Sequence, residues 1–199
     1  MDFKNNNDFL LLFEKRLSEY TGAPYVVLTS SCTDSIMLML KYLKSTEAVI
    51  PSRTYLSVAQ LLYREDIDFE YSDKPWVGSY HICDNIYDYA VGFKKDMYIS
   101  GQYQCLSFHQ KKTLNIGKGG AILLDSYEDY KILKRMAHDG RDGSVSTSSD
   151  IENIILGYHV YMSPDEAAKG VLLLNQLLDR NIIIGSSDDY PDISGIKYD

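Results

Sequence analysis

Apolar residues near the start of the chain recur at every third or fourth position. Phe9, Phe13 and Leu17 follow this spacing, and Gly22 comes after the last of them. A surface helix buries one such stripe of side chains and often ends at a glycine. The pattern therefore predicts an amphipathic helix over residues 8–20.

The chain then alternates between short apolar runs and longer amphipathic stretches. Short runs rich in β-branched and aromatic residues are typical of strands, and longer stretches with helical spacing are typical of helices. We expect strands over 25–28, 47–50, 67–71, 80–83, 104–108 and 121–124, and helices over 36–43, 55–63 and 127–138. Strands that alternate with helices predict an α/β domain with a mostly parallel central sheet.

The last third of the chain contains one expected loop and one expected helix. Residues 140–150 are small and polar, which favours a loop that could cover a site. Ser163, Pro164 and Glu166 form a helix start, because serine can cap, proline suits the first turn and glutamate completes a capping box. We expect this helix to run to about Arg180.

Composition and charge narrow the class of protein. The chain of 199 residues is 45% hydrophobic and 24% charged, which suits one globular domain with a sizeable core. A net charge of −8 argues against sequence-independent binding of nucleic acid, which needs clustered positive charge. No apolar run is long enough to cross a bilayer, and the first residues lack the layout of a signal peptide. We therefore expect a cytoplasmic protein without a membrane segment.

The three cysteines do not suggest a disulfide framework or a metal site. Cys32, Cys83 and Cys105 are an odd number and lack CxxC spacing. We expect buried free thiols and no metal.

Two polar positions lie where α/β sheets often bind ligands. The turn Thr29–Thr33 joins a predicted strand to a predicted helix, whose free backbone N–H groups favour a phosphate. Ordinary capping of the helix by Thr33 or Asp34 is the more common explanation for such a turn. Asp84 ends a predicted strand, where its carboxylate could hold a protonated ring nitrogen or cap a loop.

Lys112 lies in a long loop after an apolar strand. Such a lysine can be desolvated, which lowers its pKa and frees the amine to attack an aldehyde. A solvated surface charge is the ordinary alternative for any single lysine.

Taken together, these segments resemble the DegT-type family of sugar-nucleotide aminotransferases, which use pyridoxal phosphate. The most specific match is Ser107-Phe108-His109 with Lys112 and residues 117–121, which is similar to the family signature SFHxxKxLxxGEGGA. Five residues separate Ser107 from Lys112, as in the family, and Lys118 replaces the usual glutamate. The other matching segments are Phe13–Gly22 (FE...Y.G), Ser31–Ile36 (SGTDAL, with Cys32 for glycine), Pro51–Tyr55 (PSFTF), Ile82–Tyr87 (IEDAAQ) and Gly157–Ser163 (GYNxRMS).

The resemblance implies a fold and a set of site residues. The fold is that of aspartate aminotransferase, with helices on both faces of the sheet in three layers. Lys112 would form the internal aldimine, Asp84 would bind the pyridine nitrogen, and Tyr55 would stack on the cofactor ring. The other implied cofactor contacts are Ser31, Cys32, Thr33, Tyr87, Ser107 and His159, and the implied substrate contacts are Arg53 and Tyr161.

The resemblance also implies a homodimer and a shortened architecture. His159 and Tyr161 would approach the cofactor of the partner subunit. Residues 1–180 would form a reduced cofactor-binding large domain, and residues 181–199, which show no clear period, a tail in place of the usual small domain.

The implied function is pyridoxal-phosphate-dependent amino transfer to a keto-sugar nucleotide or a similar small carbonyl substrate. Two alternatives stay open: other carbanion chemistry at the same lysine, such as dehydration or deamination, and a non-catalytic binding module with the same fold. A simple phosphate or nucleotide binder would use the turn at Thr33 but would leave Lys112 and Asp84 unexplained.

Overall fold

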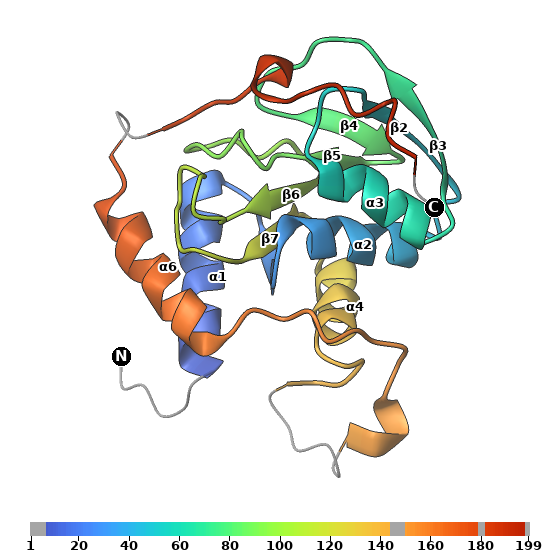
Figure 1. The fold of residues 1–199 in the computed structure, drawn as a ribbon. Helices are drawn as coiled ribbons and strands as arrows, with labels where there is room; N and C mark the ends of the chain where they lie inside the picture. Colours follow the sequence, from blue (N-terminus) through green and yellow to red (C-terminus); the bar gives the residue numbers. More distant parts are fainter. Residues whose placement is uncertain (1–6, 144–149, 179–181, 198–199) are drawn as a thin grey trace.

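A mixed sheet with helices on both sides forms the centre of the chain (Figure 1). The computed structural model describes residues 7–143, 150–178 and 182–197. Its helices are α1 (Asn7–Thr21), α2 (Cys32–Leu43), α3 (Leu56–Arg64), α4 (Tyr127–Ala137) and α6 (Pro164–Gln176), with short 3-10 turns η1 (Ile151–Asn153) and η3 (Ser187–Asp189). Its strands are β1 (Tyr25–Thr29), β2 (Glu47–Pro51), β3 (Asp68–Ser72), β4 (Tyr80–Cys83), β5 (Ile86–Asp88), β6 (Tyr103–Ser107) and β7 (Gly120–Leu124).

The α/β fold class is as expected, but the main sheet is mixed rather than mostly parallel. Its strand order is β1-β7-β6-β5-β4, and only β5 and β6 pair in parallel within it. The described part of the chain also has a separate parallel pair, β2 and β3. Two of the antiparallel pairings are those of β7 with β1 and β6, and the third arises at Asp84-Asn85, where the chain reverses directly from β4 into β5. A two-residue connection can only join antiparallel strands.

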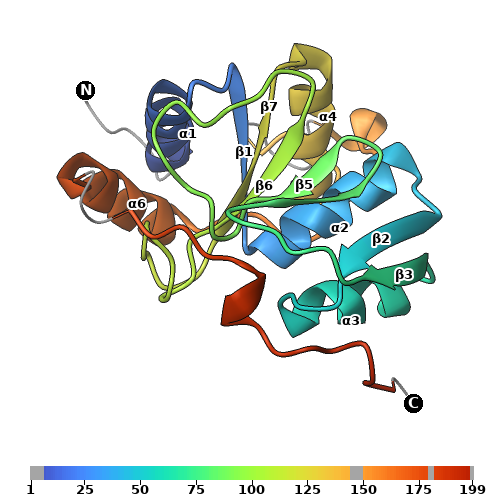
Figure 2. The same cartoon turned by 90° about the horizontal axis from the view of Figure 1, so that it is seen from above.

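Side chains of the central strands point alternately into two cores. Val26 and Leu28 of β1 face one core, while Val27 between them faces the other. The first core is covered by α1 and α6, and the second by α2, α3 and α4 (Figure 2). Successive side chains of a strand point to opposite faces of the sheet. Because both faces are buried here, the strand segments are continuous apolar runs.

The helix starts follow the local sequence. Ser163 caps α6 in a full capping box with Glu166, as the sequence predicts. The helix ends at Gln176, shorter than expected, and residues 179–181 lie outside the described residues. Most of the expected loop over 140–150 also lies outside them, since 144–149 are not described.

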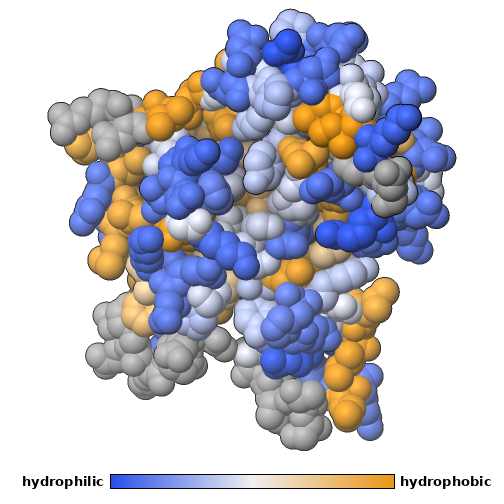
Figure 3. All heavy atoms as spheres, viewed as in Figure 1, coloured by the Kyte–Doolittle hydropathy of each residue, from blue (hydrophilic) through white to orange (hydrophobic). Residues whose placement is uncertain are grey.

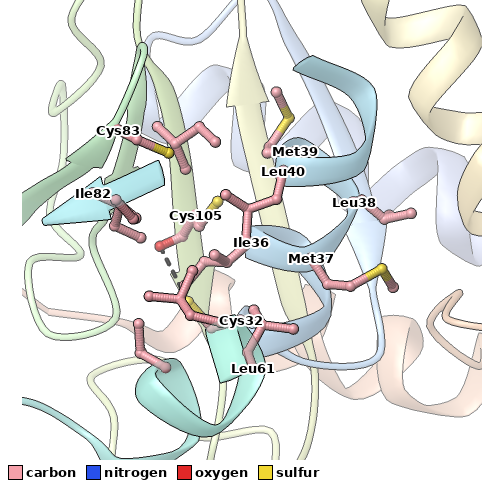
Figure 4. Close-up of a cluster of buried hydrophobic side chains, with 14 of the residues drawn as sticks. Cys32, Ile36, Met37, Leu38, Met39, Leu40, Leu61, Ile82, Cys83 and Cys105 are labelled. Carbon is pink, nitrogen blue, oxygen red and sulfur yellow. Dashed lines mark hydrogen bonds between the residues drawn. The ribbon is translucent and has the colours of Figure 1, made fainter. Parts of the chain in front are cut away.

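The three thiols are buried and unpaired, as expected. Figure 4 shows Cys32 and Ile36 of α2 beside Cys105 of β6, and the Cys32 thiol donates to the Cys105 carbonyl at 3.4 Å. Burial raises the pKa of the Cys32 thiol, so it stays protonated at neutral pH. Among the described helices, none is both long and apolar enough to span a bilayer.

We predict that Gly120→Ala destabilises the protein, because β7 begins in direct contact with the turn before α2. A Cβ on Gly120 would lie 2.3 Å from the carbonyl carbon of Ser31 and 2.6 Å from the amide nitrogen of Cys32. Both are backbone atoms, so the clash is not relieved by a side-chain rotation, and we expect a loss of about 2–3 kcal/mol in the free energy of unfolding. Urea denaturation measures this loss.

The matched control is Gly195→Ala, because a Cβ there meets no atom within 4 Å. Its unfolding midpoint should stay close to that of the unchanged protein. Equal midpoints for the two variants would contradict the close approach at Gly120.

Candidate functional site

A cavity of about 910 Å³ opens at one edge of the main sheet. β5 and β6 run in parallel and both end there, at Asp88 and Ser107. Ser107 and the end of β1 both pair with Gly120, where β7 begins. The edge at the carboxyl ends of parallel strands is where open α/β sheets commonly bind ligands.

The turn before α2 forms one wall of the cavity. Ser31, Cys32 and Thr33 line it. Ser31 is the N-cap of α2, accepting from the Asp34 amide at 3.0 Å, so the cap lies earlier than the expected Thr33 or Asp34. The Thr33 hydroxyl is hydrogen-bonded to Ser57 at 2.7 Å. The first N–H groups of a helix have no partner within it, and here they lie at the wall of a cavity.

Lys112 lines the same cavity from the loop between β6 and β7. Its backbone amide donates to the His109 carbonyl at 2.9 Å, which fixes the start of the loop. Burial lowers the pKa of the Lys112 amine, and the negative charge of Asp88 opposes this shift. The amine is therefore easier to deprotonate than that of a lysine in water.

Asp88 is the buried carboxylate that faces this lysine. Only 6% of its surface is exposed, and it lines the cavity at the end of β5. It accepts hydrogen bonds from the Ala90 amide at 2.7 Å and from the Tyr80 hydroxyl at 2.8 Å. Burial raises its pKa, while these two donors and the charge of Lys112 oppose the rise.

The prediction that Asp84 meets Lys112 was wrong. Asp84 is exposed in the turn between β4 and β5, has a φ of 45° and accepts from the Ser45 hydroxyl. The residue does not line the cavity, which lies at the other end of β5. Asp and Asn both favour turns and tolerate a positive φ, and this pair marks Asp84 as a turn residue.

A second signal points to Asp88 in the sequence. The segment Ile86-Tyr87-Asp88-Tyr89-Ala90 fits the IEDAA pattern, as does the segment that begins four residues earlier at Ile82. Only the later segment has its aspartate at the carboxyl end of a strand that is parallel to β6.

Six of the expected site residues come together in the cavity and five do not. Those in the cavity are Ser31, Cys32, Thr33, Tyr55, Ser107 and Lys112, and those outside it are Arg53, Asp84, Tyr87, His159 and Tyr161. The Tyr87 ring packs against His81, with 4.9 Å between ring centroids. The Arg53 guanidinium donates to the Tyr190 carbonyl at 3.4 Å.

His159 and Tyr161 lie in an aromatic cluster away from the cavity. The Tyr161 ring stacks on His138 at 4.3 Å, and His159 Nδ1 is 3.0 Å from a carboxylate oxygen of Asp139. Their expected approach to a partner subunit stays a prediction.

Residues that the sequence did not suggest complete the cavity wall. Ala90 and Val91 follow Asp88, and the segment after α6 adds Ile183, Gly185, Asp189 and Tyr190. This last segment has no helical or strand period, so hydrophobic patterning gave no hint of its position.

The sequence matches the profile of the DegT/DnrJ/EryC1/StrS aminotransferase family over residues 3–71 and 94–182. The chain belongs to this family. The unmatched stretch 72–93 contains the β4–β5 hairpin and Asp88.

Solved aminotransferase structures share the fold. 3-Amino-5-hydroxybenzoic acid (AHBA) synthase matches with a TM-score of 0.70 at 16% identity, over 85% of this chain and 56% of its own. DesI, solved in the presence of its TDP-sugar product, gives 0.65 at 17% identity, over 87% and 54%. Ntda from Bacillus subtilis, with bound cofactor PMP, gives 0.66 at 21% identity, over 85% and 48%.

These likenesses confirm an α/β fold of the aspartate-aminotransferase type for this family member. The chain spans 48–56% of the length of these three proteins. No curated protein sequence gives a significant match to it.

We predict that Asp88→Asn lowers the pKa of Lys112, because the carboxylate's negative charge stabilises the protonated amine. Without that charge, more of the amine is neutral at a given pH, so the amine reacts faster with acetic anhydride. The rate at Lys112 as a function of pH, followed by peptide mass spectrometry, gives its pKa.

Asp84→Asn is the matched control for this charge change. Because Asp84 is exposed and outside the cavity, the Lys112 titration should stay unchanged in this variant. A shift with Asp84→Asn and none with Asp88→Asn would reverse the assignment.

Proposed function

We propose that this chain is a pyridoxal-phosphate-dependent aminotransferase that uses Lys112 to hold its cofactor. The observation that carries the proposal is that the Lys112 amine and the Asp88 carboxylate line one cavity together with the hydroxyl-rich turn before α2. The cavity, at about 910 Å³, is within the range of sites for small ligands.

The phosphate of the cofactor suits the turn before α2. Thr33 and Ser107 offer hydroxyls around the N-terminus of the helix, where backbone N–H groups and the helix dipole favour an anion, while the Ser31 hydroxyl donates to the Asp34 carboxylate at 2.6 Å. Gly120 lets β7 approach this turn closely, and Gly119 forms a backbone bridge with Ser31. The donor set therefore fits a phosphate.

The ring of the cofactor suits the deeper part of the cavity. Asp88 is a buried carboxylate whose negative charge is disfavoured by burial, so a protonated ring nitrogen would be a favourable partner. Tyr55 is exposed at the cavity wall, where its aromatic face could stack on the cofactor ring. Ala90 lines the same cavity with a small side chain that leaves room for the ring. These residues replace the expected combination of Asp84 and Tyr87.

Lys112 has the properties that the reaction requires of it. Its lowered pKa makes the neutral amine accessible, so that it can bond to the aldehyde of the cofactor and, when displaced, accept or donate a proton. Bound pyridoxal phosphate would supply an electron sink beside the substrate carbon to and from which this amine would move a proton. Asp88 would keep the ring nitrogen protonated, which favours this chemistry.

The proposed substrate is a keto-sugar nucleotide or a similar small carbonyl compound. Support comes from family membership and from the sugar-nucleotide product named for DesI. We assign the cofactor-binding role to residues 1–180 and treat 181–199 as a tail that joins the cavity wall.

We further propose a homodimer in which His159 and Tyr161 approach the cofactor of the partner subunit. The segment that precedes His159 carries an apolar strip on its surface. Figure 3 shows this strip over η1 and the residues that follow it. Ile151, Ile154 and Leu156 belong to this strip, and Leu156 is 80% exposed. Contiguous exposed apolar surface of this kind favours association with another protein surface.

Lys112→Ala should abolish the visible absorbance that the protein gains with pyridoxal phosphate, because it removes the half-buried amine that interacts with Asp88 in the cavity. The control is Lys111→Ala, whose side chain also borders the cavity but is exposed. A Lys112→Ala protein with the absorbance of the unchanged chain would contradict the proposal.

The reaction class has its own test. Addition of glutamate to the loaded protein should convert the bound cofactor into its amine form, with loss of the visible band. A band that persists while ammonia is released would instead favour deamination, and a protein that binds no cofactor would favour a non-catalytic module.

Leu156→Asp should weaken the dimer, because it places a charge in the centre of the apolar strip. Light scattering should give twice the chain mass of 22.7 kDa for the unchanged protein and a lower mass for the variant at the same concentration. Leu172→Asp, at a 63% exposed position on α6, is the control that should stay dimeric. A monomeric unchanged protein that binds the cofactor fully would rule out the shared site.

A further inference from the structure

The segment after α6 is fixed against the cofactor cavity on both sides of Tyr190. Upstream, the Gly185 amide donates to the Val91 carbonyl at 3.0 Å, and the Gly185 carbonyl accepts from Gly78 at 2.7 Å. Downstream, the Ile193 amide donates to the Ser52 carbonyl at 2.8 Å. The segment therefore forms part of the wall and is not merely a loose end.

Packing holds the Tyr190 side chain in place. Its ring lies against Trp76, with 5.7 Å between centroids, and the Trp76 indole donates to the Arg53 carbonyl at 2.9 Å. Tyr190 is half-buried and lines the cavity beside Asp189. An aromatic side chain supported in this way presents its hydroxyl with little loss of conformational entropy.

The surroundings keep the phenol protonated. Burial, with the charges of Asp88 and Asp189, raises the pKa of Tyr190 to about 12. At neutral pH the side chain is therefore a hydrogen-bond donor in a cavity wall that it shares with acidic groups.

The segment after β5 has an apolar residue at a position where the family motif IEDAAQ has a polar one. In the pattern IEDAAQ, read with Asp88 as its aspartate, the last position falls on Val91, which is apolar. Gly185 packs directly on Val91, since a Cβ on Gly185 would lie 2.9 Å from Val91 Cβ. The segment that carries Tyr190 thus covers the position where the polar group is missing.

We propose that Tyr190 is a cofactor-binding residue, whose phenol donates a hydrogen bond to the ring oxygen of pyridoxal phosphate held by Lys112 and Asp88. This inference rests on the proposed function and adds a contact from a part of the chain that lies outside the family match, which ends at residue 182. The bond stabilises the ionised ring oxygen, so it affects both affinity and the titration of the bound cofactor.

The test compares Tyr190→Phe with the unchanged protein. Loss of one hydrogen bond should weaken the binding of pyridoxal phosphate about two- to tenfold, measured by fluorescence titration. It should also move the pH midpoint of the visible band upward, because the ionised ring oxygen loses a donor. The control is Tyr127→Phe, at an exposed position outside the cavity, which should alter neither quantity.

Unchanged affinity and an unchanged midpoint in Tyr190→Phe would overturn the inference. An unchanged protein that binds no pyridoxal phosphate would overturn the proposed function itself, so the two failures are distinguishable.

Discussion

The amine of Lys112 and the carboxylate of Asp88 share one partly dehydrated cavity, and most of the site depends on this pairing. Burial pushes the pKa of the amine down and that of the carboxylate up, so each charge is costly alone. Each also restrains the shift of the other. A ligand with an aldehyde at one end and a protonatable nitrogen at the other would satisfy both groups, which is the chemical reason for proposing pyridoxal phosphate.

The fold brings these two groups together through a single parallel pair of strands. β5 and β6 end at the same edge, which places Asp88 next to the strand that leads into the Lys112 loop. β7 then returns antiparallel to β6 and begins at Gly120, in contact with the turn before α2. The phosphate turn, the carboxylate and the lysine therefore depend on one arrangement of backbone, and a change at Gly120 would disturb all three.

The sequence predicted those parts of the site that have a strong local pattern. The Lys112 loop and the turn at Ser31 were identified because their motifs are compact and lie between elements with clear periodicity. The sequence favours Asp84 over Asp88 because β5 is only three residues long and shows no strand pattern of its own beside β4. Tyr190 could not be found from its sequence, since its position depends on long-range packing against Trp76 and on the hydrogen bond from Gly185 to Val91 that fixes its segment, and not on local propensity.

Reduction with borohydride identifies the lysine that holds the cofactor, because it turns the bond between them into a stable amine. The protein is incubated with pyridoxal phosphate, reduced, digested and mapped by mass spectrometry. The account predicts one pyridoxyl group, attached to the peptide at Lys112. A label found on another lysine, or spread over several with Lys112 unmodified, would contradict it.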